Sequence, residues 1–259
     1  MGCGRVNSLS ASRTRTSPWP RWRVVQSGDL IALTPTRPSM PLANDDSTAE
    51  TRQILVDSRA LLANDHFVYI SGDHGSGWID KDAIFVDPHR IRRLTQLLAA
   101  AVGHFQAEIL CGPATGGLIV AQWTAFELGL PAVFAEHTAP RSSELHGEFT
   151  LHRGYDQLVA GKRVLVVDDV VNTGLSIRQT ATAVQRAGGT VIAAAALVDR
   201  GNVDAQSLGV PEYFYLVEHD IPDWSAAECP LCQSGVPINT RYAHGQDFLD
   251  AKQQSAADS

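Results

Sequence analysis

Short apolar runs alternate with segments of helical periodicity from residue 90 to residue 217, and this alternation constrains the fold more than any other feature. The apolar runs are rich in β-branched residues, which is typical of strands buried on both faces. Strands that alternate with helices of about a dozen residues form βαβ units and predict an α/β fold with a mostly parallel sheet flanked by helices. The expected helices are 90–102, 116–128 and 176–187, and the expected strands are 107–111, 132–135, 163–167, 190–198 and 213–217.

The segment 47–87 precedes this alternation and predicts a small additional layer, which we call the hood. Ser47 and Thr48 are typical helix caps, and apolar side chains recur at helical spacing as far as Asn64. Short strands are expected at 67–70 and 83–86. The glycine-rich stretch 71–77 between them predicts a turn or a loop that faces a ligand.

Composition excludes several classes of protein. Of the 259 residues, 44% are hydrophobic and 19% are charged, so the chain as a whole is not disordered. The apolar run 191–198 is far shorter than the roughly 20 residues that a membrane-spanning helix needs. A net charge of −7 argues against a protein that binds nucleic acid through bulk electrostatics.

Residues 1–39 differ in composition from the rest of the chain and are expected to be a disordered or non-native extension. They are rich in Ser, Thr, Pro and Arg, and Asp29 is their only acidic residue. Three origins remain open: a basic arm, an Arg-rich targeting presequence, or a start codon assigned upstream of a true start at Met40. We expect a main domain over 40–220 and a tail over 221–259. Four scattered cysteines without a recognisable secretory signal favour a cytoplasmic protein.

The stretch from Lys162 to Ser176 carries the most informative chemistry. A buried strand runs into the adjacent acids Asp168 and Asp169, and a short turn containing Gly174 then opens a helix. The free N–H groups at a helix start attract anions, and glycine lets the backbone turn tightly around a phosphate. The carboxylates lie at the carboxyl end of the strand, where open α/β sheets bind ligands. The stretch therefore predicts a phosphate site with ribose-binding acids.

This stretch resembles the phosphoribosyl-pyrophosphate (PRPP) signature of the type I phosphoribosyltransferases. The resemblance implies that Asp168 and Asp169 contact the ribose 2′ and 3′ hydroxyls and that the following turn holds the 5′-phosphate. Asn172 stands where the family usually has Thr or Ser, but its amide also donates a hydrogen bond. The PRPP loop implied in this way comprises Val170, Val171, Asn172, Thr173, Gly174, Leu175 and Ser176.

A second segment, 108–118, resembles the family's pyrophosphate loop, because a strand is followed by a glycine-rich turn into a helix. Its free N–H groups would face the leaving diphosphate. Gly116 stands where some members have Lys and others Gly. The residues assigned to this loop are Ala114, Thr115, Gly116 and Gly117.

Two further segments resemble orotate phosphoribosyltransferases in particular. Ser71 and Gly72 lie in a stretch similar to the loop that closes over the base, although Ile70 stands where those enzymes usually have Lys. Arg200 follows a strand at the place where they bind the orotate carboxylate, and its planar guanidinium suits that group. A surface arginine is the alternative interpretation of Arg200.

Residues 136–152 stand where the same enzymes have a mobile loop rich in Arg and Lys, which neutralises the departing diphosphate. Here Arg141 and His146 are the candidates for catalytic roles beside Asp168 and Asp169, and the segment contains no Lys. A loop so poor in cations is compatible with a weaker catalyst, a different base or a protein that only binds PRPP.

The tail contains Cys229 and Cys232 in a Cys-x-x-Cys arrangement, which is half of a zinc site. Two packed thiols without metal are the alternative interpretation. His74, in the glycine-rich stretch, is the histidine expected to contact a substrate. Further candidate ligands for a zinc ion are Cys3, Cys111, His219 and His244.

Together these features predict an enzyme that transfers the phosphoribosyl group of PRPP to a nitrogenous base, with Mg²⁺ on the diphosphate. Orotate is the first expectation for the acceptor, and a purine or another base is the second. A non-catalytic PRPP-binding regulator is the rival of another class. A nicotinamide-dependent dehydrogenase is disfavoured because no G-x-G-x-x-G follows a strand. The resemblance also implies a homodimer, and neither nucleic acid nor a membrane is expected as a partner.

Overall fold

The computed structural model describes residues 45–138, 148–201 and 203–257, all of which belong to one compact unit, Pro38–Ser259. The residues 1–39, for which an extension is expected, lie outside the described part. The helices are α1 (Asp45–Asp57), α2 (Asp82–Phe85), α3 (Pro88–Val102), the short 3₁₀ helix η1 (Gly103–Phe105), α4 (Gly116–Leu128), α5 (Tyr155–Val159), α6 (Leu175–Arg186), α7 (Ala205–Leu208), α8 (Pro230–Gln233) and α9 (Gly245–Ala257). The strands are β1 (Leu61–Val68), β2 (His74–Ile79), β3 (Ile109–Pro113), β4 (Ala132–His137), β5 (Phe149–Thr150), β6 (Arg163–Val171), β7 (Thr190–Asp199), β8 (Tyr213–Glu218) and β9 (Asp223–Trp224).

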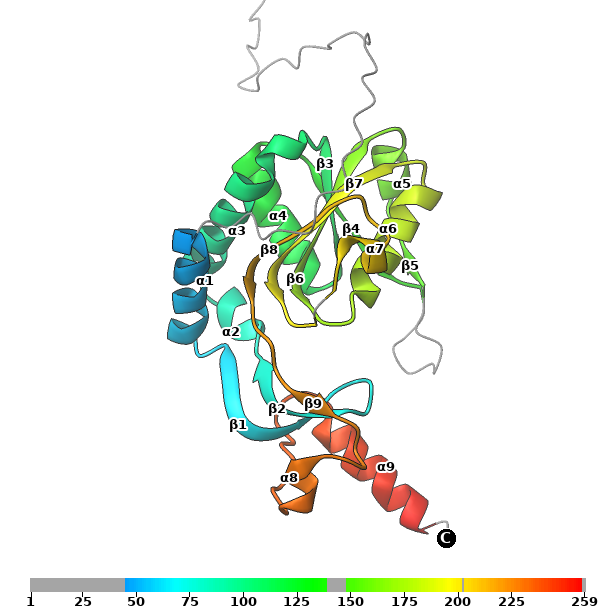
Figure 1. Cartoon of the computed structure of the whole chain (residues 1–259). Coiled ribbons are helices and arrows are strands. Elements are labelled where there is room, and N and C mark those ends of the chain that lie inside the picture. The colour runs from blue at the N-terminus through cyan, green and yellow to red at the C-terminus, as the bar shows by residue number, and fades with distance from the viewer. Residues whose placement is uncertain (1–44, 139–147, 202, 258–259) are drawn as a thin grey trace, which may run out of the picture. The chain divides into compact units, whose positions relative to one another are not determined.

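A six-stranded sheet forms the centre of the fold (Figure 1), with the strand order β5-β4-β3-β6-β7-β8. Every neighbouring pair is parallel except β4 and β5, which are antiparallel. The predicted α/β fold with a mostly parallel sheet is therefore confirmed. The order places β6 in the middle of the sheet, beside β3, so that the two loops expected to bind PRPP leave adjacent strands.

The core has two layers, one on each face of this sheet. Side chains of β6 alternate between them: Leu165 and Val167 join one apolar cluster, and Val164 and Val166 join the other. Helices α3 and α4 cover the first face and α6 covers the second (Figure 1). Because β6 is buried on both faces, its sequence is a continuous apolar run. The sheet is thus a rigid support for whatever follows its strands.

The hood contains α1, β1, β2 and α2, and it differs from the expectation in three places. The helix ends at Asp57, before Leu61 and Leu62, because these two residues pair with β2 as the start of β1. Residues 83–86 are largely helix α2 rather than a strand. Most of the glycine-rich stretch 71–77 is strand β2, so the connecting loop is confined to 69–73.

The tail returns to the hood. Strand β9 pairs antiparallel with β2 and completes a three-stranded sheet of order β1-β2-β9. The backbone N–H groups of Asn239 and His244 donate to the carbonyls of His66 and Val68 on the other edge of β1. Both edges of the β1–β2 hairpin are therefore covered by tail residues. Within the described ranges, no helix is both long enough and apolar enough to span a membrane.

Candidate active site

Two adjacent carboxylates stand at the carboxyl end of the central strand. Strand β6 continues four residues beyond the expected end, because Val170 and Val171 still pair with β7. Asp168 and Asp169 therefore lie inside the strand and expose only 6% and 5% of their surface. Burial, together with the neighbouring Asp169 carboxylate, raises the pKa of Asp168 well above its ordinary value. A ligand with hydroxyl groups would relieve this confined charge by donating hydrogen bonds to it.

The turn after β6 places backbone N–H groups at the start of α6, of which that of Leu175 donates to Thr173 Oγ1 at 3.4 Å. Gly174 adopts a φ of +71°, a left-handed conformation that glycine accepts without strain. Thr173 is exposed and Ser176 is half-buried, so hydroxyl groups accompany the backbone N–H groups at this end. Arg178 stiffens the turn by donating to the Thr173 carbonyl at 2.8 Å. The turn has the form expected of a phosphate cradle, and α6, at 12 residues, is long enough to direct its dipole there.

The glycine-rich turn before α4 lies directly against the two acids. A Cβ atom added to Gly116 would collide with the Asp169 carboxylate, and one added to Gly117 would lie 2.9 Å from Asp168 Oδ1. Ala114 and Thr115, which are joined by a cis peptide bond, stand at the more accessible end of the turn. The expectation of a free N–H at Ala114 is wrong, because this group donates to the Ala135 carbonyl at 2.8 Å and so continues the pairing of β3 with β4. The structure thus brings together the two loops that the sequence assigned separately to diphosphate and to ribose phosphate.

Lys81 is a site residue that the sequence analysis missed. Its Nζ lies 3.1 Å from Asp169 Oδ2, while its side chain remains 43% exposed. Burial works against the charge of this amine, but the carboxylates of Asp169 and Asp168 outweigh it and raise the pKa of Lys81. A cation therefore stands between the acids and the solvent. The only signal for Lys81 in the sequence is the rarity of lysine, since the chain has three lysines, at positions 81, 162 and 252.

Arg200 lies beside these loops, where β7 ends. It is 7% exposed, and its backbone N–H donates to the Val171 carbonyl at 2.7 Å. The guanidinium carbon lies 4.5 Å from the centre of the Tyr69 ring, a cation–π contact with the hood. A surface arginine, the alternative interpretation, does not fit this burial.

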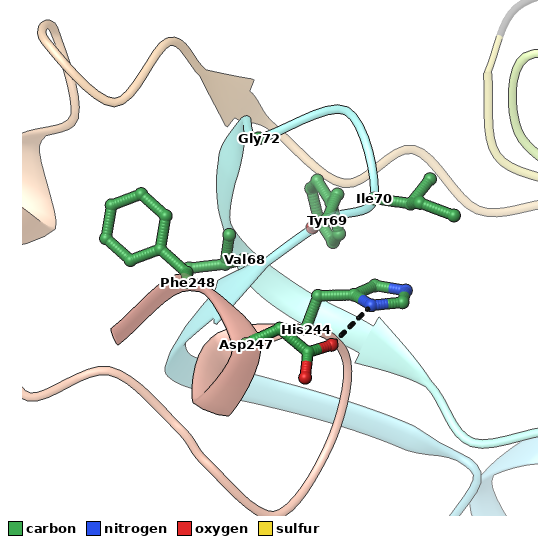
Figure 2. Close-up of a pocket in the computed structure, with 7 residues that line it drawn as sticks. All are labelled: Val68, Tyr69, Ile70, Gly72, His244, Asp247 and Phe248. Atoms are coloured by element: carbon green, nitrogen blue, oxygen red, sulfur yellow. Dashed lines mark hydrogen bonds and ion pairs between the residues drawn. The ribbon is translucent and has the colours of Figure 1, made fainter. Parts of the chain in front are cut away.

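The hood loop 69–73 carries the other residues expected to face the base. Ser71 and Gly72 are exposed, and the Ser71 hydroxyl donates to Asp73 Oδ2 at 2.8 Å. Ile70 is 73% exposed and points away from the hairpin in Figure 2. Tyr69 anchors the loop, because its hydroxyl donates to the Gly77 carbonyl at 2.8 Å. In this structure the loop therefore reaches Arg200 through Tyr69, while Ser71 and Gly72 face solvent.

Other expected site residues are distributed differently. Arg141 and His146 lie outside the described residues. His74 was expected to contact a substrate from a loop, but it is wholly buried in β2. Its ring lies against His66 and near the two tail cysteines, and these four residues form a group able to bind a metal ion. His66 was not among the expected ligands, and the partners expected for the two cysteines were Cys3, Cys111, His219 and His244.

Comparisons with known proteins show the family of this chain. Residues 81–226 match the phosphoribosyl transferase domain family. Orotate phosphoribosyltransferase of Maricaulis maris is 35% identical, over 71% of this chain and 93% of that protein. The enzyme of the same name from Novosphingobium aromaticivorans is 40% identical, over 67% of this chain and 85% of that protein. Among solved structures, orotate phosphoribosyltransferase from Aeropyrum pernix aligns with a TM-score of 0.52 and 28% identity, over 64% of this chain and 92% of that one.

Proposed function

Because the chain belongs to the phosphoribosyltransferase family, we propose that it transfers the phosphoribosyl group of PRPP to orotate, giving orotidine 5′-monophosphate and diphosphate. The observation that carries the proposal is that two turns with the form of anion sites, a buried acid pair and a buried arginine lie together at the carboxyl end of the parallel strands. The orotate phosphoribosyltransferases of Maricaulis maris and Novosphingobium aromaticivorans support orotate as the acceptor.

The two turns bind different phosphate groups of PRPP. The α6 N-terminus binds the 5′-phosphate through backbone N–H groups and the hydroxyls of Thr173 and Ser176. The N–H groups of Thr115, Gly116 and Gly117 face the diphosphate, whereas that of Ala114 donates to the Ala135 carbonyl. Asp168 and Asp169 accept hydrogen bonds from the ribose hydroxyls and stabilise the positive charge that develops on the sugar as the diphosphate departs. Because these dipoles are fixed before the reaction, they need no reorganisation in the transition state.

Magnesium fits the charges of this site. PRPP brings several phosphate oxygens, and the two buried carboxylates supply further oxygen ligands or acceptors for metal-bound water, which is the chemistry that Mg²⁺ prefers. When bound, Mg²⁺ supplies Lewis-acid stabilisation of the diphosphate as a leaving group. Asp168 and Asp169 would hold it through the ribose hydroxyls or bound water. Lys81 adds a positive charge from the protein itself, beside Asp169.

The residues beside the expected position of the base favour an acceptor that carries a carboxylate. Arg200 presents a planar donor set whose position is fixed by Tyr69, and burial strengthens a hydrogen-bonded ion pair with an anionic base. Orotate carries such a carboxylate. It also reacts as an anion, so the site needs no general base to remove a proton. The exposed Ser71 and Gly72 would close over the base once it is bound.

We expect Arg200→Lys to raise the KM for orotate by about 10- to 100-fold. A lysine keeps the charge but loses the bidentate geometry, which corresponds to about 1.5–3 kcal/mol for hydrogen bonds to a charged group. The KM for PRPP should change little. Steady-state kinetics with each substrate varied in turn measures both values. Equal losses for both substrates would contradict a role for Arg200 in base recognition.

Lys81→Ala should lower kcat/KM for PRPP by about 10- to 100-fold, because it removes a cation that faces the departing diphosphate. Lys162→Ala is the matched control, since Lys162 is also about half exposed and pairs with Glu108 away from the acids. Diphosphate release by the two variants, each at saturating orotate, provides the measurement. If the two variants behaved alike, Lys81 would have no special role in the site.

The proposed activity is tested by following diphosphate release from PRPP and Mg²⁺ with orotate, adenine, hypoxanthine, xanthine or uracil as the only acceptor. Release with orotate alone is the expected result. Release with another base would keep the mechanism and overturn the acceptor. PRPP binding in calorimetry without release for any base would instead favour the PRPP-binding regulator.

We also propose that the protein is a cytoplasmic homodimer in which 40–220 forms the transferase domain and 221–259 the tail. The support for the dimer is the resemblance of 136–152 to a loop that reaches the neighbouring subunit's site in related enzymes. Sedimentation equilibrium of the full chain gives the oligomeric state, and a monomer at assay concentration would contradict this part.

A further inference from the structure

We propose that His66, His74, Cys229 and Cys232 bind a structural zinc ion, which fastens the tail to the loop end of the β1–β2 hairpin. One ligand atom from each residue lies within 4.8 Å of every other. Two imidazole nitrogens and two sulfurs make the Cys₂His₂ set that is typical of closed structural zinc sites. The site is separate from the acid pair and the PRPP loops, and its argument does not depend on the proposed reaction.

Three sulfur–nitrogen distances match those of a tetrahedral centre. A tetrahedral zinc ion with bonds of about 2.3 Å to sulfur and 2.0–2.1 Å to nitrogen separates each sulfur from each nitrogen by about 3.5 Å. Cys229 Sγ lies 3.6 Å from His66 Nε2, and Cys232 Sγ lies 3.7 Å from the same nitrogen and 3.4 Å from His74 Nδ1. The two nitrogens are 2.7 Å apart, so the rings must separate by roughly 0.6 Å to admit the ion.

The local structure of the β1–β2 hairpin places His66 and His74 side by side. The pairing of β1 with β2 is irregular between Ala63 and Phe67, and Asn64 has a φ of +60°. An irregularity of this kind redirects a side chain, and here it brings His66 to His74 on the next strand. The Nδ1–H of His66 donates to the Val236 carbonyl at 2.8 Å. Because the proton of the neutral ring is then on Nδ1, the lone pair of Nε2 is directed toward the cluster.

The cysteines are equally well placed. Cys229 is the N-cap of α8, and Pro230 begins the helix, so a single helical turn carries both sulfurs. The Cys232 backbone N–H donates to Cys229 Sγ at 3.5 Å, an outer hydrogen bond that stabilises a metal-bound thiolate. Cys111 is not part of this group, because it lies in β3 of the central sheet.

Charge and burial also favour a metal ion over unmetallated side chains. His66, His74 and Cys229 expose at most 1% of their surface. A divalent cation with two thiolates and two neutral imidazoles has no net charge, so the centre can be buried without an uncompensated ion. Cys232 is exposed and gives the metal a path into the site.

The site joins three segments of the chain. His74 follows the loop 69–73 directly, and Val68, its cross-strand partner, precedes that loop. Tail residues Phe248 and His244 pack beside Val68 (Figure 2), and the Phe248 ring meets His74 edge-on with centroids 5.0 Å apart. A metal at this junction would hold both ends of the loop that carries Tyr69, and with it the partner of Arg200.

Metal analysis of the purified full-length protein tests the proposal. We expect about one zinc ion per chain in the wild type and background levels in Cys229→Ser/Cys232→Ser. Cys111→Ala is the matched control and should retain its zinc. Zinc retained by the double variant, or a wild type that neither contains zinc nor takes it up after reduction, would overturn the site.

A second measurement remains informative if the double variant fails to fold. The wild-type protein is stripped of metal, loaded with Co²⁺ and examined by visible and X-ray absorption spectroscopy. The proposal predicts a tetrahedral spectrum with two sulfur and two nitrogen ligands. An octahedral spectrum, or one without sulfur, would contradict it. Neither readout uses catalysis, so failure of the zinc site and failure of the proposed reaction are distinguishable.

Discussion

Replacing both site aspartates, as Asp168→Asn/Asp169→Asn, should lower kcat/KM for PRPP by about 10³-fold or more. In the proposed mechanism each carboxylate accepts hydrogen bonds from the ribose and faces the positive charge that grows there, and loss of a single fixed electrostatic group at a reacting centre costs about 10²–10³-fold. An amide has nearly the same shape but no charge. The loss should therefore appear in kcat as well as in PRPP affinity.

The same substitution should leave the folded protein as stable as the wild type or more stable. Burial and the neighbouring carboxylate raise the pKa of Asp168 in the folded chain above its unfolded value. Ionisation at neutral pH therefore favours the unfolded state, and the destabilisation fades as the pH falls through the folded pKa. An amide is uncharged at every pH, so it removes this destabilisation of the folded state. Lys81, which now pairs with Asp169, is more than a third exposed and loses little with its partner.

Thermal unfolding at pH 7 and PRPP calorimetry separate the two effects. We expect the double variant to be inactive and its Tm to equal or exceed that of the wild type. A variant that loses activity together with stability would assign the acids a structural role. Single variants, Asp168→Asn and Asp169→Asn, serve as controls for repulsion between the pair, because either one alone should relieve it.

Gly116→Ala should reduce PRPP affinity by about 10- to 100-fold although alanine is the better helix former. A Cβ at this position would overlap the Asp169 carboxylate and lie 3.1 Å from Lys81 Nζ. The carboxylate must therefore leave the ribose-binding position, and the turn that faces the diphosphate must shift with it. Both contacts belong to the ligand site, so binding should suffer more than folding.

Gly103→Ala is the matched control. Its Cβ would meet only Leu128, at an ordinary contact distance of 3.6 Å, and its φ of −58° suits any residue. Calorimetric titration with PRPP and Mg²⁺ compares the two variants. Equal affinities would mean that the Gly116 turn does not have to lie so close to the acids.

The sequence predicted the parts of the fold that local patterns encode. The parallel strands are apolar runs with β-branched residues, and the helix 116–128 was predicted with its observed bounds. The hood was predicted less well. Leu61 and Leu62 continue the helical spacing of α1, but pairing with β2 forms a strand there, and this tertiary contact leaves no periodic signal.

The candidate site divides in the same way. The two candidate PRPP loops could be selected from the sequence because each is a contiguous motif. Lys81 belongs to the hood and Asp169 to the central sheet, and no sequence motif includes both residues, so their ion pair could not be predicted. His66 and Cys229 are 163 residues apart, so the partners of the Cys-x-x-Cys pair could not be chosen among nine histidines without the three-dimensional arrangement.

The central claim is tested most directly by identifying the products. Purified wild-type protein is incubated with PRPP, Mg²⁺ and orotate, and orotidine 5′-monophosphate and diphosphate are quantified by mass spectrometry and a coupled assay. The account predicts equal amounts of the two products, both absent with Asp168→Asn/Asp169→Asn. Diphosphate without the nucleotide, or product formation that survives in the double variant, would contradict it.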